Sequence, residues 1–144
     1  MICEATTNDL EDLLRLYTHL HNNAMPVIDE EFRGMWKEII EDPHHHIIIA
    51  REGEHIISSV VLIIIPNLTH NQRPYGLVEN VITHPDYRKK GYAGACLDYG
   101  KELAKKAGCY KLMLMTGSKD DNTLHFYEQA GYNRNDKTAF IQWL

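Results

Sequence analysis

The sequence predicts an α/β (α+β) fold, with helices flanking a mixed central sheet in the element order ααβββαβαβ. Apolar residues at helical spacing dominate the first 40 positions, β-branched runs bounded by turn residues follow, and helical and strand patterns then alternate. A mixed sheet covered by helices is the economical way to bury such a set. No repeat, low-complexity tract or composition shift divides the chain, so we expect a single domain over residues 1–144.

Two helices are expected at the start of the chain. A leucine-rich stripe follows Thr6, which can cap the first helix together with Asp9 three residues later. This helix is expected to end near residues 21–23. Asp29 is placed to cap the second helix, which must end before Pro43.

Three strands are expected next. β-Branched runs at His46–Arg51 and His55–Ile65 are separated by Glu52-Gly53-Glu54, which is the form of a hairpin. A polar loop at Asn67–Arg73 leads to a further strand, Tyr75–Thr83.

The second half alternates helix and strand. From Gly91 the apolar positions form one helical stripe that stops at Gly108. A short strand at Tyr110–Met115, a short helix at Asn122–Ala130 and a final strand at Ala139–Leu144 are expected after it.

Composition excludes several classes of function. The formal net charge of −5 and the pI near 6.0 argue against general binding of nucleic acid or anionic membranes. The longest apolar run, Val60–Ile65, is too short to cross a bilayer. Three cysteines without C-x-x-C spacing suggest neither a disulfide framework nor a zinc site, and favour the cytoplasm. His44-His45-His46 cannot all face one ion from regular backbone, so no metal site is predicted.

A basic, glycine-containing loop precedes the long helix. Helix N-termini hold phosphate because the macrodipole and the free amides both favour negative charge, and glycine lets phosphate approach the backbone. The alternative is a solvated basic turn with a glycine N-cap. The candidate phosphate-binding residues are Arg88, Lys89, Lys90, Gly91, Tyr92, Ala93 and Gly94.

The second half of the chain contains two short motifs, Arg88-x-x-Gly91-x-Ala93 and, at residues 126–132, Phe-Tyr-Glu-Gln-Ala-Gly-Tyr. They resemble the R/Q-x-x-G-x-G/A signature and the F-Y-E-x-x-G-F/Y element of the GNAT superfamily of N-acetyltransferases. The predicted element order matches the GNAT acyl-CoA N-acyltransferase fold over nearly the whole chain. The C-terminal half is also similar to glucosamine-6-phosphate and aminoalkylphosphonate N-acetyltransferases.

The resemblance implies acetyl-CoA as cosubstrate and no metal. The pyrophosphate of acetyl-CoA would lie on the loop from Lys89 to Gly94. The pantetheine would lie along Val81, Ile82 and Thr83 and pair with their backbone groups as an added strand does. A backbone amide of Val81 or Ile82 would then polarise the thioester carbonyl.

The resemblance also implies two catalytic residues. Glu79 matches the glutamate taken as the base in the amino-sugar enzymes, and strict strand alternation would put it on the same face as Val81. His84 is an alternative proton acceptor. Tyr127 matches the family's tyrosine acid. Many members have an asparagine seven residues before that tyrosine, where this chain has Asp120, so Asn122 either replaces it at the pantetheine or only caps the helix.

We therefore expect an N-acetyltransferase (an acyltransferase of the EC 2.3.1 type) that acts on a primary amine of a small molecule by direct attack. The alternatives are a non-catalytic acyl-CoA-binding module or sensor, and a peptide or protein N-acetyltransferase. Arg33, Lys37 and Arg73 are cations that could bind a phosphate or phosphonate on the substrate. Dimerisation is common in the family, so a homodimer is a further expectation.

Overall fold

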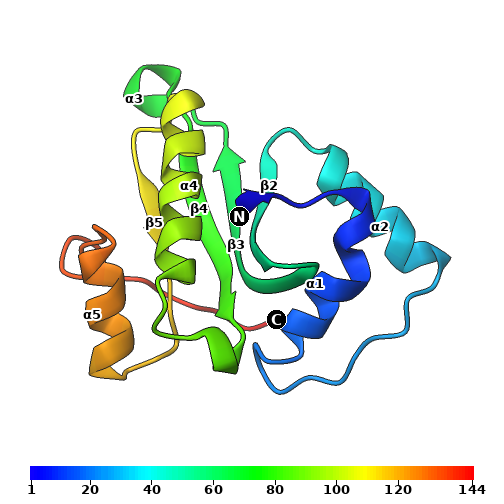
Figure 1. The fold of residues 1–144 in the computed structure, drawn as a ribbon. Coiled ribbons are helices and arrows are strands. Elements are labelled where there is room, and N and C mark those ends of the chain that lie inside the picture. Colours follow the sequence, from blue (N-terminus) through cyan, green and yellow to red (C-terminus); the bar gives the residue numbers. More distant parts are fainter.

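A five-stranded sheet with helices on both faces forms the centre of the computed structural model, which describes residues 1–144 (Figure 1). The strands lie in chain order across the sheet, and only the last pair, β4 and β5, is parallel. The strands are β1 (Ile2–Glu4), β2 (His45–Glu52), β3 (His55–Ile65), β4 (Tyr75–Thr83) and β5 (Leu112–Leu114).

Most predicted helices are present within a few residues of their expected bounds. None of them is both long and apolar enough to span a bilayer. The α-helices are α1 (Leu10–Tyr17), α2 (Glu30–Glu41), α3 (Thr69–Gln72), α4 (Tyr92–Lys106) and α5 (Asp121–Gln129), and single 3-10 turns are η1 (Thr7–Asp9) and η2 (Pro85–Tyr87).

The sheet separates two apolar cores. On one face Leu13 of α1 and Trp36 of α2 pack in a cluster with Val61 of β3; on the other, Leu97 of α4 packs in a cluster with Leu62. Neighbouring residues of β3 thus enter opposite cores, as strand alternation requires. We call these sides the α1/α2 face and the α4 face.

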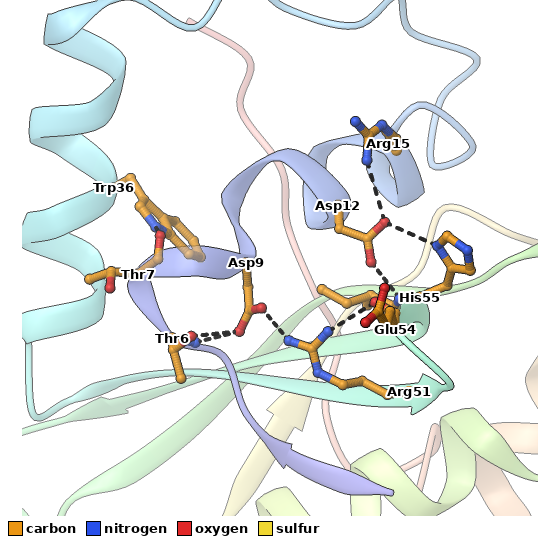
Figure 2. Close-up of polar contacts among 10 residues, drawn as sticks. Thr6, Thr7, Asp9, Asp12, Arg15, Trp36, Arg51, Glu54 and His55 are labelled. Carbon is orange, nitrogen blue, oxygen red and sulfur yellow. Dashed lines mark hydrogen bonds and ion pairs between the residues drawn. The ribbon is translucent and has the colours of Figure 1, made fainter.

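A polar network anchors the N-terminal segment to the hairpin (Figure 2). The backbone N–H and the hydroxyl of Thr6 donate to Asp9 at 2.7 and 3.0 Å, which confirms the predicted cap, here on η1. The other Asp9 oxygen binds the Arg51 guanidinium of β2, and the indole of Trp36 donates to the Thr7 carbonyl at 3.0 Å. Burial raises the pKa of Asp9, but the bonds from Thr6 and Arg51 outweigh it and hold that pKa below its ordinary value.

Some predicted elements were wrong at the ends of the chain. Residues 139–144 form no strand, because no other strand of the chain lies beside them. β1 was missed, since three residues carry no readable period. The first helix ends at Tyr17, four residues earlier than expected, and continues as turns. The predicted loop contains α3, a single left-handed turn with positive φ at residues 70–72.

Candidate active site

β4, which carries the predicted base Glu79, separates from β5 partway along its length. The two strands pair from Gly76 with Leu112 as far as Val78 with Leu114, and β4 then continues to Thr83 without a neighbour on that side. The pairing is tight at its start, because a Cβ on Gly76 would clash with the side chain of Leu112. Residues 79–83 of β4 therefore border a gap where an extended ligand could add as a strand.

A β-bulge lies in the unpaired part of β4. Glu79 pairs with Val61 and Ile82 with Ser59, so two residues of β4 oppose one of β3 between these pairs. Asn80 has φ of +48°, the left-handed conformation that a bulge can require. The local kink re-aims the side chains that follow.

The bulge changes which residues share a face. Glu79 lies across from Val61 on the α1/α2 face, where Ile82 also packs, whereas Val81 packs against the α4-face cluster. The expectation that Glu79 and Val81 share a face was wrong, because one extra residue inverts the alternation. Glu79 thus faces the layer formed by the first two helices.

Glu79 and His84, the two candidate proton acceptors, differ in the contacts that their side chains already make. Glu79 is half-buried, and none of the chain's side-chain hydrogen bonds or ion pairs involves it. His84 accepts a hydrogen bond at Nδ1 from the Asp86 backbone N–H at 3.3 Å, and its ring meets that of His19 edge-on at 4.7 Å between centroids. The neutral His84 ring therefore carries its proton on Nε2 and caps η2. Of the two, only the Glu79 side chain forms no hydrogen bond within the chain.

The loop before α4 has the form predicted for an anion site. Four successive N–H groups, those of residues 91–94, have no acceptor within the chain, and the first intrahelical bond runs from Ala95 N–H to the Gly91 carbonyl. Gly91 is the N-cap with φ of +85°, and Lys89 also has positive φ at +60°. These amides and the positive end of the helix dipole are both available to an anion at the N-terminus of α4.

The three basic side chains of the loop have different contacts. Arg88 Nε donates to the Thr83 carbonyl at 3.3 Å, which ties the loop to the end of β4. Lys90 Nζ lies 4.8 Å from the ring centroid of Tyr87. Lys89 is exposed and forms no ion pair, so it is the cation most available to a phosphate.

Tyr127 lies on α5 and packs against the same α4-face cluster as Val81. Tyr127 is half-buried, and its hydroxyl forms no hydrogen bond within the chain. Burial raises its pKa above the ordinary value. The phenol is therefore protonated at neutral pH, as a general acid requires.

The helix α5 is capped by Asp120 and not by Asn122. Asp120 accepts a hydrogen bond from the Thr123 backbone N–H at 3.1 Å. Asn122 lies exposed in the first turn with no side-chain hydrogen bond of its own. This removes capping as its role, and contact with pantetheine stays a prediction.

Cys96 has the structural role predicted for it. Cys96 is fully buried in the α4-face core, and burial raises its pKa to about 11, so it is a small core residue. His44, His45 and His46 belong to no cluster of metal-ligating side chains. His46 Nδ1 pairs with the Glu4 carboxylate at 2.7 Å.

The cations considered for a substrate phosphate are already engaged. Arg33 pairs with Glu11 at 2.8 Å and Lys37 with Glu41 at 3.7 Å. Arg73 donates to two backbone carbonyls before β5. Each of the three therefore has a competing partner within the chain.

The sequence analysis did not identify two buried hydroxyls that lie beside β4. The Tyr17 and Ser59 hydroxyls are buried beside each other, neither has a hydrogen-bond partner at standard geometry, and Ser59 lies directly across from Ile82. The polar pair Ser58-Ser59 interrupting an apolar run was the available signal.

Comparison with known proteins agrees with this geometry. The chain is 33% identical over 82 residues to glucosamine 6-phosphate N-acetyltransferase of Trypanosoma brucei brucei, a stretch that covers 57% of this chain and 54% of that protein. It is 24% identical over 145 residues to aminoglycoside N(6')-acetyltransferase type 1 of Serratia marcescens, covering 99% and 97%. A solved structure of a candidate acetyltransferase from Agrobacterium tumefaciens is 32% identical, with a TM-score of 0.91 and 99% of both chains covered.

The family model described as acetyltransferase (GNAT) matches residues 8–132. That range contains the split between β4 and β5, the bulge and the loop before α4. The expected fold class is confirmed, and this chain belongs to the acetyltransferase (GNAT) family.

Proposed function

We propose that this protein, as a single domain over residues 1–144, is an N-acetyltransferase that transfers acetyl from acetyl-CoA to a primary amine of a small molecule. The observation that carries the proposal is the unpaired, bulged segment of β4, bordered by a free carboxylate and a free phenol and followed by four unpaired amides. Acetyl-CoA supplies an activated acetyl group as a thioester.

The residues present fit that cosubstrate. The N–H groups of residues 91–94 and the Lys89 ammonium suit a pyrophosphate. The open edge of Val81, Ile82 and Thr83 suits the amides of pantetheine, and a backbone N–H beside the bulge polarises the thioester carbonyl. A cavity of about 360 Å³ between α4 and α5, lined in part by Gly94, offers additional room.

Proton transfer is assigned to two side chains on different faces of the sheet. Glu79, unpaired on the α1/α2 face, takes a proton from the ammonium group of the acceptor, directly or through water, and the resulting amine is the nucleophile. Tyr127, on the α4 face, returns a proton to the leaving thiolate. The amine attacks the acetyl carbon directly, and neither step needs a protein nucleophile or a metal ion.

The acceptor is proposed to enter between β4 and the layer of α1 and α2. Because Arg33, Lys37 and Arg73 are engaged elsewhere and the chain carries −5 formal charge, a cationic amine without phosphate suits the protein better than a phosphorylated one. We also propose that the enzyme is cytoplasmic, as its odd number of cysteines suggests, and a homodimer.

The test is a thiol-release assay with acetyl-CoA and a panel of aminoglycosides, polyamines, amino-sugar phosphates, aminoalkylphosphonates and lysine peptides. Amine-dependent release is expected. Glu79→Gln and Tyr127→Phe should each lower turnover by about 10²–10⁴-fold with acetyl-CoA affinity retained. The matched controls are Glu38→Gln, an exposed glutamate of α2, and Tyr132→Phe, which packs beside Tyr127 with 6.4 Å between ring centroids.

Three results would contradict the proposal. Tight acetyl-CoA binding without release across the panel would indicate an acyl-CoA sensor. Release with lysine peptides alone would indicate a peptide or protein acetyltransferase. An unchanged pH profile of turnover in Glu79→Gln would remove Glu79 as the base.

A further inference from the structure

Ser58 of β3 places a hydroxyl inside the apolar core of the α4 face. The side chain is fully buried, and Ser58 pairs with Ala50 of the α4-face cluster. Residues 56–65 are otherwise apolar except for Ser59. A buried hydroxyl costs free energy unless it is hydrogen-bonded, so the bonds that it makes indicate what the serine does.

Both hydrogen-bond partners of Ser58 lie in β4 beyond the bulge. Ser58 Oγ donates to the Ile82 carbonyl at 3.0 Å and lies 2.8 Å from Thr83 Oγ1. Because a serine has a single hydroxyl proton and Ser58 gives it to the carbonyl, the Thr83 hydroxyl donates to Ser58. One buried side chain thus binds two consecutive residues of the neighbouring strand.

The segment that Ser58 binds has few other contacts with β3. After the bulge at Asn80, β4 pairs with β3 only at Ile82 and Thr83. The next residue, His84, donates its backbone N–H to the Ile57 carbonyl of β3 at 2.8 Å. Ser58 therefore supplies a large share of the hydrogen bonds that hold this segment in place.

These bonds set the direction of the backbone groups. The Ile82 carbonyl and the His84 N–H both point toward β3. Backbone groups alternate in direction along a strand, so those of Val81 and Thr83 point the other way, toward the gap beside β5. The Thr83 carbonyl indeed accepts a bond from Arg88 Nε of the loop and not from β3.

We propose that Ser58 is a positioning residue for acetyl-CoA, because its hydroxyl holds Ile82 and Thr83 in the orientation that presents Val81 to the ligand. The identity of the ligand rests on the proposed function, whereas the bonds to β4 exist in the free chain. Without the hydroxyl, the Ile82 carbonyl loses its side-chain donor and the segment populates other orientations. Acetyl-CoA binds one orientation only, so its apparent affinity falls with the fraction of molecules that adopt it.

Ser59 provides a matched control in the same strand. It is also fully buried and lies across from Ile82, but its hydroxyl is on the α1/α2 face and makes no bond to β4. Ser58→Ala and Ser59→Ala therefore remove the same atom from opposite faces of β3.

The experiment compares acetyl-CoA binding by titration calorimetry with steady-state turnover. Ser58→Ala should raise the dissociation constant at least about tenfold, and Ser59→Ala should leave it unchanged. The KM for acetyl-CoA should rise by the same factor, while kcat at saturating acetyl-CoA stays near that of the wild type, because the bound ligand restores the orientation. A general loss of folded protein would lower kcat and leave KM unchanged.

The partner hydroxyl gives a second pair of variants, which keeps the test decisive if Ser58→Ala does not fold. Thr83→Val removes the hydroxyl at nearly constant size and should weaken acetyl-CoA binding, whereas Thr83→Ser keeps the hydroxyl and should bind as the wild type does. The effects of Thr83→Val and Ser58→Ala should be non-additive, as for residues in contact.

Amide hydrogen exchange of the free protein tests the hold on β4 without any ligand. Exchange at the His84 N–H should be about tenfold faster in Ser58→Ala and unchanged in Ser59→Ala, because only Ser58 binds the preceding residues. If the wild type binds no acetyl-CoA, the proposed function fails, and exchange at His84 still decides whether Ser58 holds the segment.

Three results would overturn the positioning role. The first is equal acetyl-CoA affinity in Ser58→Ala and Ser59→Ala. The second is a fall in kcat with KM unchanged in Ser58→Ala. The third is wild-type exchange at His84 in Ser58→Ala, which would show that the segment is held without the hydroxyl.

Discussion

Two glycines at opposite ends of α4 allow the phosphate loop to be tested against the helix itself. Gly91 begins the helix with φ of +85°, and Gly108 follows its end with φ of +80°. No heavy atom lies within 4 Å of the position that a Cβ would take on either glycine. The cost of alanine at both sites is therefore backbone strain alone, about 1–2 kcal/mol.

Thermal unfolding of the free protein should show equal destabilisation. For a domain of this size about 1–2 kcal/mol corresponds to a fall in Tm of about 3–6 °C in both Gly91→Ala and Gly108→Ala. Because the strain is matched, Gly108→Ala controls for any general loosening of α4. An unchanged Tm in Gly91→Ala would refute the left-handed cap.

Acetyl-CoA affinity should separate the two variants. Relaxing the Gly91 backbone turns the unpaired amides of residues 91–94 away from a bound phosphate. Loss of one hydrogen bond to a charged group, about 1.5–3 kcal/mol, weakens binding at least about tenfold. Titration calorimetry should show this in Gly91→Ala and wild-type affinity in Gly108→Ala. Equal affinities in the two variants, with both melting temperatures lowered, would refute the phosphate-loop assignment.

Two further predictions concern stability and thiol reactivity. Asp9→Asn should lower the free energy of unfolding at neutral pH by about 2 kcal/mol, because it keeps an acceptor for Thr6 but leaves the Arg51 guanidinium without its carboxylate partner. The folded-state pKa of Asp9 is lowered from 3.8, so the stabilisation by Asp9 is present above that value and is lost as pH falls through the folded-state pKa. Urea melts at a series of pH values should show this loss in the wild type and not in Asp9→Asn. If the free energy of unfolding falls equally with acid in both proteins, the assignment is contradicted. Cys96 should resist thiol reagents in the folded protein while the half-buried Cys3 and Cys109 react, and labelling of Cys96 at a similar rate, followed by mass spectrometry, would show instead that α4 opens readily.

Local patterns were sufficient for most of the fold. The stripe from Gly91 to Gly108, the hairpin strands on either side of Gly53 and the cap at Asp29 all depend on residues close in sequence, and the structure confirms them. Asp29, for example, accepts a hydrogen bond from the Phe32 N–H at 2.8 Å. Periodicity and capping report the contacts that a segment makes with its own neighbours.

Only part of the candidate site could be predicted from the sequence. The basic loop with its glycine N-cap could be predicted because glycine, basic residues and a helix start are consecutive. The face of Glu79 could not, because the bulge at Asn80 exists only in the pairing of β4 with β3. Whether Arg33 was free depended on Glu11, which lies 22 positions away on another helix.

The sequence by itself determined most of the elements, the start of α4 after a basic, glycine-containing loop and the family, since each follows from residues near one another along the chain or from motifs of fixed spacing. Only the tertiary structure decided which face Glu79 occupies, which cations are free and that residues 139–144 lack a partner in their own chain. The physical reason is that strand pairing and ion pairing join residues far apart in sequence, and a single extra residue in one strand inverts every side chain beyond it.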